Sequence, residues 1–185
     1  MVTFYVMLRA ATRWLLLSYR LPREPTRLRL AVWRRLKRVG AVPLHGAVWT
    51  VPLDAKTRED FEWLAEEIEE GRGTALLWAA DSLEVAQDRR IAARLGREAD
   101  ARYAAIAAAA RGVARAATGG RQADRLEAAL RQVRRLEREL RLERRRDFFR
   151  GTGRRAAERA VTEAADAIRA RLDSHALDHA PSLPR

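Results

Sequence analysis

Residues 13–52 read RWLLLSYRLPREPTRLRLAVWRRLKRVGAVPLHGAVWTVP, and this stretch decides the fold. The apolar run 14–19 has the length of a strand, and two prolines follow it closely. Apolar residues then recur at helical spacing up to Gly40, which can end a helix in a left-handed turn. Two further strand-like runs meet at His45 and Gly46, a short hairpin turn. The stretch therefore predicts strand, helix, strand and strand in succession.

The next residues extend this order to βαββαβ. Residues 54–70 place Phe61, Leu64 and Ile68 on one helical face. Either Asp54 or Thr57 can cap the start of that helix, and Thr57 with Asp60 has the spacing of a capping box. Residues 74–79, TALLWA, read as a last strand. We predict an α+β chain whose residues 12–82 form a ferredoxin-like module.

Residues 83–173 are predicted to form an α-helical hairpin followed by a further C-terminal helix. Apolar residues recur at helical spacing over 91–117 and again from Leu126 to Leu140, with two glycines between the two series. A second break at 147–153 precedes the last helix, which is expected over about 154–172. Segments 1–11 and 174–185 are expected to be flexible.

The charge pattern points to an anionic partner. The net charge is +12, and all but two of the 37 basic residues are arginine. Such a chain favours polyanions because binding releases their counterions. Two groups of arginines are predicted to bind nucleic acid: Arg27, Arg34, Arg35 and Arg38 in the first helix, and Arg131, Arg134, Arg138, Arg141 and Arg145 in the longer helix. The alternative is a solvated surface that binds nothing.

In the second arginine group, ion pairs within the helix would favour a solvated surface over a binding site. Three glutamates interrupt the arginines at helical neighbour spacing, and each can form an ion pair within the helix. The expected pairs are Glu137–Arg141, Glu139–Arg135 and Glu143–Arg146. Such pairs would neutralise part of the cluster.

Chemistry typical of enzymes is scarce. The chain has no cysteine, which excludes disulfides, thiolate catalysis and thiolate metal sites. His45 falls in a turn, and His175 and His179 have helical spacing but no convincing third ligand. We therefore predict no catalytic residues, no metal site and no cofactor. Residues 151–153, Gly-Thr-Gly, read either as an anion-binding helix start or as a plain turn between helices.

No apolar run approaches the ~18 residues of a membrane span. Arg9 and Arg13 interrupt the apolar N-terminal residues, so we expect no signal peptide and a cytoplasmic location. Each of the five tryptophans falls within an expected strand or helix, and most are expected in the core or in a dimer interface.

The motif RRLKRVGAVPLHGAVWTVP at 34–52, preceded by WLLL at 14–17 and Leu21-Pro22, resembles the N-terminal domain of the chromate-resistance regulator ChrB. More distantly it is similar to the ferredoxin-like domains of phenylacetate-type repressors and CRISPR adaptation nucleases. The resemblance implies a DNA-binding repressor of a chromate-resistance operon, with chromate as the effector. Ferredoxin-like domains of this kind often pair through sheet faces or edges, so we expect a homodimer.

The nuclease likeness does not extend to the metal site. Those nucleases carry a metal-binding aspartate at the end of the first strand, where this chain has Leu17-Ser18-Tyr19. We therefore predict that the chain is not an enzyme. The alternative to a DNA-binding regulator is a dimerising protein-interaction module without DNA binding.

Overall fold

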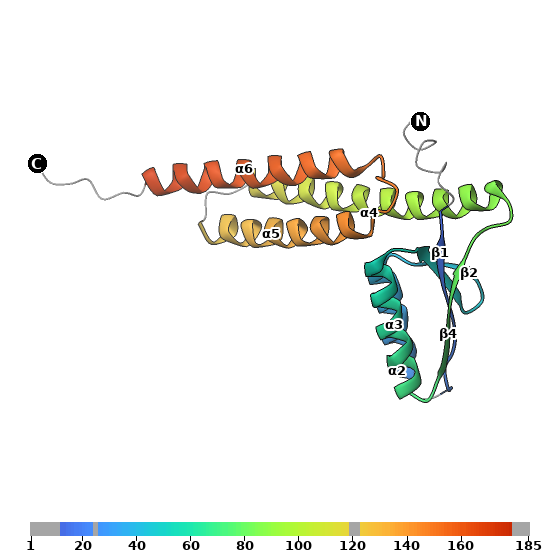
Figure 1. The fold of residues 1–185 in the computed structure, drawn as a ribbon. Helices are drawn as coiled ribbons and strands as arrows, with labels where there is room; N and C mark the ends of the chain where they lie inside the picture. Colours follow the sequence, from blue (N-terminus) through green and yellow to red (C-terminus); the bar gives the residue numbers. More distant parts are fainter. Residues whose placement is uncertain (1–11, 24–25, 119–122, 179–185) are drawn as a thin grey trace, which may run out of the picture. The chain divides into compact units, whose positions relative to one another are not determined.

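The computed structural model describes residues 12–23, 26–118 and 123–178, which contain four strands and five helices (Figure 1). Their bounds are β1 (Trp14–Arg20), α2 (Thr26–Val39), β2 (Val42–His45), β3 (Val48–Pro52), α3 (Ala55–Glu70), β4 (Thr74–Ala80), α4 (Val85–Thr118), α5 (Ala123–Arg146) and α6 (Arg154–Asp178). The expected mixed α+β class is confirmed. Helix α6 extends past its expected end, and residues 1–11 and 179–185 of the segments expected to be flexible lie outside the described residues.

The chain divides into two compact units. The sheet unit comprises the residues up to Arg97 together with Arg146–Phe149, and the helical unit comprises Glu98–Arg145 together with the residues from Arg150 on. Helix α4 begins in the sheet unit and continues in the helical unit. The predicted bounds of the ferredoxin-like module, 12–82, and of the helical region, 83–173, stay predictions.

The sheet is antiparallel throughout, with the strand order β2-β3-β1-β4. Strand β1 pairs with two neighbours, so that Leu17 lies opposite Trp49 of β3 and Leu77 of β4. Strand β4 is an edge strand that has neither proline nor a charged residue. Its unpaired side therefore lacks the usual protection against pairing with another chain.

Helices α2 and α3 lie side by side on one face of the sheet (Figure 1). Residues of both helices pack on alternate residues of β1 and β3, because side chains of a strand point to opposite faces in turn. The main contributors to this core are Leu15, Leu17, Val32, Leu36, Trp49, Val51, Phe61, Leu64 and Ile68.

A capping box begins α3 one turn earlier than the Thr57 and Asp60 spacing suggested. The N-cap is Asp54, whose carboxylate accepts from the Thr57 amide at 2.7 Å, while the Asp54 amide donates to Thr57 Oγ1 at 2.9 Å. Thr57 is also buried and donates to the Pro52 carbonyl. Its hydroxyl thus joins the helix start to the end of β3.

The opposite sheet face carries a smaller core within the sheet unit. Trp14 and Val42 pack there with Ile91 and Leu95 of α4. The indole of Trp14 donates to a carboxylate oxygen of the buried Asp88 at 2.6 Å, which satisfies both polar groups.

The helical unit is built on a repeated apolar seam of α5. The buried residues Leu126, Ala129, Val133, Leu136, Leu140 and Glu143 follow one another at steps of three and four. They pack with small residues of α4 and α6 such as Ala110 and Ala164. Since Arg102 of α4 contacts Glu143 near the end of α5, the two helices run antiparallel, as expected. The turn between them, 119–122, lies outside the described residues.

Glu143 is the charged member of this seam. Its side chain is fully buried, and Arg102 Nε donates to both carboxylate oxygens at 2.8 and 2.7 Å. Glu143 therefore faces inward, toward Arg102 of α4, a partner on another helix that the spacing within α5 did not indicate. The expected pair of Glu143 with Arg146 stays a prediction.

Replacing Glu143 with alanine leaves the partly buried guanidinium of Arg102 without its main partner. We expect the free energy of unfolding to fall by about 3–5 kcal/mol, the usual cost of breaking a buried pair. Urea denaturation of the variant measures this loss. The matched control is Glu137→Ala on the same helix. Glu137 forms no ion pair within the described residues, so its replacement should change the free energy of unfolding by less than about 0.5 kcal/mol.

Gly40 ends α2 in a left-handed conformation, with φ +87°. A Cβ at this position would lie 2.8 Å from Cβ of Arg146 and 3.2 Å from its carbonyl oxygen. Gly46 in the hairpin has φ +52°, but a Cβ there would meet no atom within 4 Å.

We therefore expect Gly40→Ala to destabilise the protein more than Gly46→Ala. Both changes strain the backbone by about 1–2 kcal/mol, and only the first also adds a clash. Chemical denaturation of the two variants gives the comparison, and equal losses would contradict close packing of Gly40 on Arg146.

Candidate polyanion-binding surface

Five exposed arginines form a row along α5. Arg131, Arg134, Arg138, Arg141 and Arg145 follow one another at steps of three and four, so they share one helix face. Each stands two positions before or after a member of the buried seam, such as Val133 or Leu140, which turns it about 200° away from the core. The row extends over about 21 Å at 1.5 Å per residue.

Most of this arginine row is not neutralised by neighbouring acids. Arg134, Arg138, Arg141 and Arg145 form no ion pair with any residue that the structure describes. Arg131 lies 3.6 Å from Glu127, but both side chains are more than 60% exposed, at 67% and 62%. An exposed pair of this kind contributes at most about 1 kcal/mol, so phosphate can replace the carboxylate.

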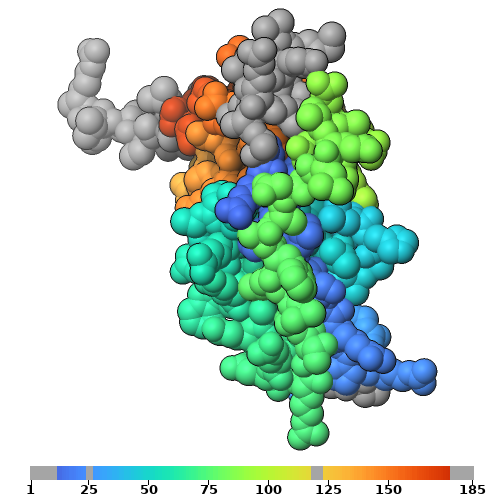
Figure 2. Space-filling model, turned by 45° about the vertical axis from the view of Figure 1, so that its right-hand side comes forward, coloured from blue at the N-terminus to red at the C-terminus, as the bar shows by residue number. Residues whose placement is uncertain are grey.

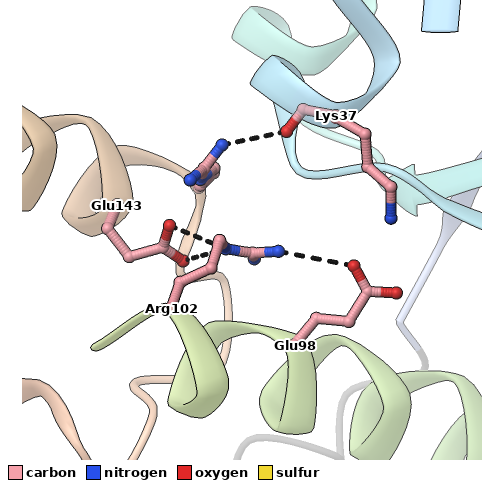
Figure 3. A network of polar contacts seen from close by, with 5 residues as sticks. Lys37, Glu98, Arg102 and Glu143 are labelled. Carbon is pink, nitrogen blue, oxygen red and sulfur yellow. Dashed lines mark hydrogen bonds and ion pairs between the residues drawn. The ribbon is translucent and has the colours of Figure 1, made fainter. Parts of the chain in front are cut away.

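Glu137, Glu139 and Glu143 form no ion pair with a member of the arginine row in the described part of the chain. Glu139 pairs with Arg135 at 3.0 Å, as expected, and Arg135 lies outside the row. The expected pair of Glu137 with Arg141 is not formed among the described residues. Glu143 is buried against Arg102, which also contacts Glu98 (Figure 3). The row therefore keeps its positive charge.

One of the four arginines predicted on α2 differs from the other three in its surroundings. Arg27, Arg34 and Arg38 are exposed on the side of α2 that faces away from the buried Val32 and Leu36. Arg35 instead lies 3.4 Å from Glu67 of α3. Only three of the four predicted residues thus share one exposed face.

Within the sheet unit, the C-terminal end of α2 contacts Arg146, the last residue of α5. Arg146 donates to the carbonyl oxygen of Lys37 at 2.9 Å (Figure 3). The same carbonyl also accepts from the amide of Gly40 at 3.3 Å, and a cation at the C-terminal end of a helix is favoured by the partial negative charge there. Arg146 therefore has a structural contact, unlike the members of the arginine row.

The acidic face of α3 adjoins these α2 arginines. Glu59, Glu66, Glu69 and Glu70 are exposed, and none of them pairs with a basic residue in the described part of the chain. Packed helices lie about 8–10 Å apart, which is comparable to the screening length of about 8 Å at physiological salt. A polyanion on α2 would therefore also be repelled by α3.

Three of the five tryptophans are exposed, which sequence reasoning missed. Trp14 and Trp49 belong to the core, whereas Trp33, Trp63 and Trp78 are 47%, 58% and 56% exposed. The sequence did indicate the exposure of Trp63, because this residue follows the buried Phe61 by two positions and so points away from it on a helix. Strand β4, which carries Trp78, lies at the surface in Figure 2.

The Gly-Thr-Gly segment 151–153 is occupied by the protein's own carboxylate. Asp100 accepts from Thr152 Oγ1 at 3.0 Å and from the amide of Gly153 at 2.9 Å, at the start of α6. The segment is therefore a turn whose helix start is already capped, and the anion-binding alternative is wrong for a foreign ligand.

The acidic and histidine side chains of the described residues are dispersed. No three of their His, Cys, Asp and Glu side chains gather as a metal site would require. At the end of β1, burial is the main cause that raises the pKa of Tyr19 above its usual value, so its phenol stays neutral at physiological pH. A hollow of about 330 Å³ beside β4 is lined by Arg13 and Arg58, but these pair with Asp81 and Glu62.

Comparison with known proteins identifies the family. The family model described as Protein ChrB, N-terminal, matches residues 29–175, which is most of the chain. Comparison with curated proteins gave no match, and neither did comparison with solved structures. No helix in the described ranges has the length and apolar character of a membrane span. The match includes the motif after Arg34 and both helical breaks, and the chain therefore belongs to the ChrB N-terminal family.

Proposed function

We propose that this chain is a non-enzymatic, DNA-binding transcriptional regulator of the chromate-resistance type, acting in the cytoplasm as a homodimer. Its membership of the ChrB N-terminal family supports the regulatory role. The observation that carries DNA binding is the arginine row of α5, four of whose five members have no acidic partner among the described residues.

The row suits the phosphates of a nucleic acid strand. Guanidinium groups bind phosphate oxygens through two parallel hydrogen bonds. A length of about 21 Å corresponds to about six phosphates of one strand, at 3.4 Å each along the duplex axis. Five such contacts would give a slope of about −4.5 for the logarithm of affinity against the logarithm of salt concentration. These contacts hold and orient the DNA without reading its bases.

We also propose that the sheet unit is ferredoxin-like. The chain order β1-α2-β2-β3-α3-β4 and the antiparallel strand order β2-β3-β1-β4 support this assignment. In this arrangement the two helices share one sheet face, which brings α2 and α3 together. The arginines of α2 then contribute less to DNA binding than the α5 row, because α3 is acidic.

A second candidate is a dimerising protein-interaction module without DNA binding. The exposed large apolar residues of the sheet unit favour it, since Trp63, Leu76 and Trp78 are each more than half exposed, at 58%, 58% and 56%. Such residues are typical of protein interfaces. DNA binding and its dependence on salt separate the two candidates.

The double variant Arg134→Gln/Arg138→Gln removes two central members of the row. We expect weaker binding to a duplex of about 30 base pairs, which is longer than the row. We also expect a salt slope shallower by about 2, because each phosphate contact that is lost reduces the slope by about 0.9. Fluorescence anisotropy between about 50 and 200 mM salt measures both quantities.

The matched control is Arg155→Gln/Arg159→Gln. It removes two exposed arginines of α6 that form no ion pair within the described residues. This variant should keep the slope of the original chain. If both variants lose slope equally, net charge alone governs binding and the row is not the site.

Chromate is proposed as the effector, because its oxygens can accept from guanidinium groups as phosphate oxygens do. A ligand releases DNA only if it binds the free state better than the DNA-bound state. We therefore expect chromate to lower duplex affinity more than sulfate does at equal ionic strength. The anisotropy titration tests this, and identical effects of the two dianions would reject chromate as a specific effector.

A further inference from the structure

Helices α2 and α3 present opposite charges on the same face of the sheet unit. On the outward side of α2 lie the cations of Arg27, Arg34 and Arg38. On the outward side of α3 lie Glu59, Glu66 and Glu70. None of these six side chains forms an ion pair within the described ranges, so each surface keeps its charge.

Large apolar side chains interrupt both charged surfaces. Leu30 and Trp33 of α2 are 44% and 47% exposed, and Trp63 of α3 is 58% exposed. Tryptophan and arginine are the residues that most often dominate the energy of protein interfaces. Water around three exposed apolar groups is unfavourable, so a partner that covers them is stabilised.

The charge pattern selects the partner. A nucleic acid would be attracted to α2 but repelled by α3. A uniformly basic partner would be attracted to α3 but repelled by α2. A second copy of this chain matches both helices at once. A twofold axis that lies between the two copies and runs along the helices places α2 of each copy against α3 of the other.

We propose that the outward faces of α2 and α3 are the homodimer interface, with each basic α2 packed on the partner's acidic α3. The inference builds on the homodimer of the proposed function and assigns its surface. It also divides the arginines, because the α2 group serves self-association and the α5 row serves DNA. The tryptophans Trp33 and Trp63 are then covered in the dimer.

Two charge-reversal variants test this arrangement. One is Arg34→Glu/Arg38→Glu in α2, and the other is Glu66→Arg/Glu70→Arg in α3. Each variant alone places like charges at both contacts of its own homodimer, so we expect it to sediment as a monomer. An equimolar mixture restores opposite charges at both contacts, so we expect a heterodimer in analytical ultracentrifugation.

Circular dichroism establishes that each variant is folded. If a charge reversal prevents folding, the neutral variant Trp63→Gln replaces it and should weaken dimerisation at least tenfold, by about 1.4 kcal/mol. The matched control is Trp78→Gln on the edge strand β4, which is equally exposed and should leave the dimer unchanged.

Three results would overturn the interface: a monomeric original chain, a mixture of folded variants that stays monomeric, or a dimer that Trp78→Gln dissociates. The last result would move self-association to β4. The DNA proposal fails separately, because Arg134→Gln/Arg138→Gln should leave the dimer intact. A dimer that does not bind duplex at low salt would reject the proposed function and retain the interface.

Discussion

Burial of the apolar seam of α5 is the constraint on which the proposed surface depends. Core residues at steps of three and four occupy one side of the helix, and the arginine row follows the same steps two positions away. Once Val133 and Leu140 are buried, the helix geometry turns the arginines into solvent. Packing of α4, α5 and α6 therefore creates the positive surface without any contact among the arginines themselves.

Helices α2 and α3 also separate an apolar side from a charged side. Each helix buries an apolar side on the sheet and exposes a charged one, but the exposed charges have opposite signs. Attraction across a partly exposed pair such as Arg35 and Glu67 contributes little to stability. The opposite charges of the two helices bear more on recognition, because the mixed surface disfavours a polyanion and is complementary to itself after a twofold rotation.

Hydrogen bonds to acidic side chains define how distant segments meet. Asp88 accepts from Trp14, Glu143 accepts from Arg102, and Asp100 accepts from the start of α6. The first two acids are buried and would be costly to bury without their partners, so a shifted packing of these helices or strands would be disfavoured. Asp100 also occupies the helix start that the sequence offered as an anion site.

Much of this structure could be predicted from the sequence, because apolar periodicity is local. It predicted the helix that ends at Gly40, the hairpin of two strands and the break before α6. The turn of that hairpin is one residue later than predicted, at Gly46 and Ala47, and His45 belongs to β2. Only the tertiary structure decided that Glu143 faces Arg102, that Asp100 caps α6 and that Trp33 and Trp63 are exposed. Spacing along a helix determines which residues share a side. Which distant element covers that side depends on packing between segments far apart in the chain, and no local pattern records it.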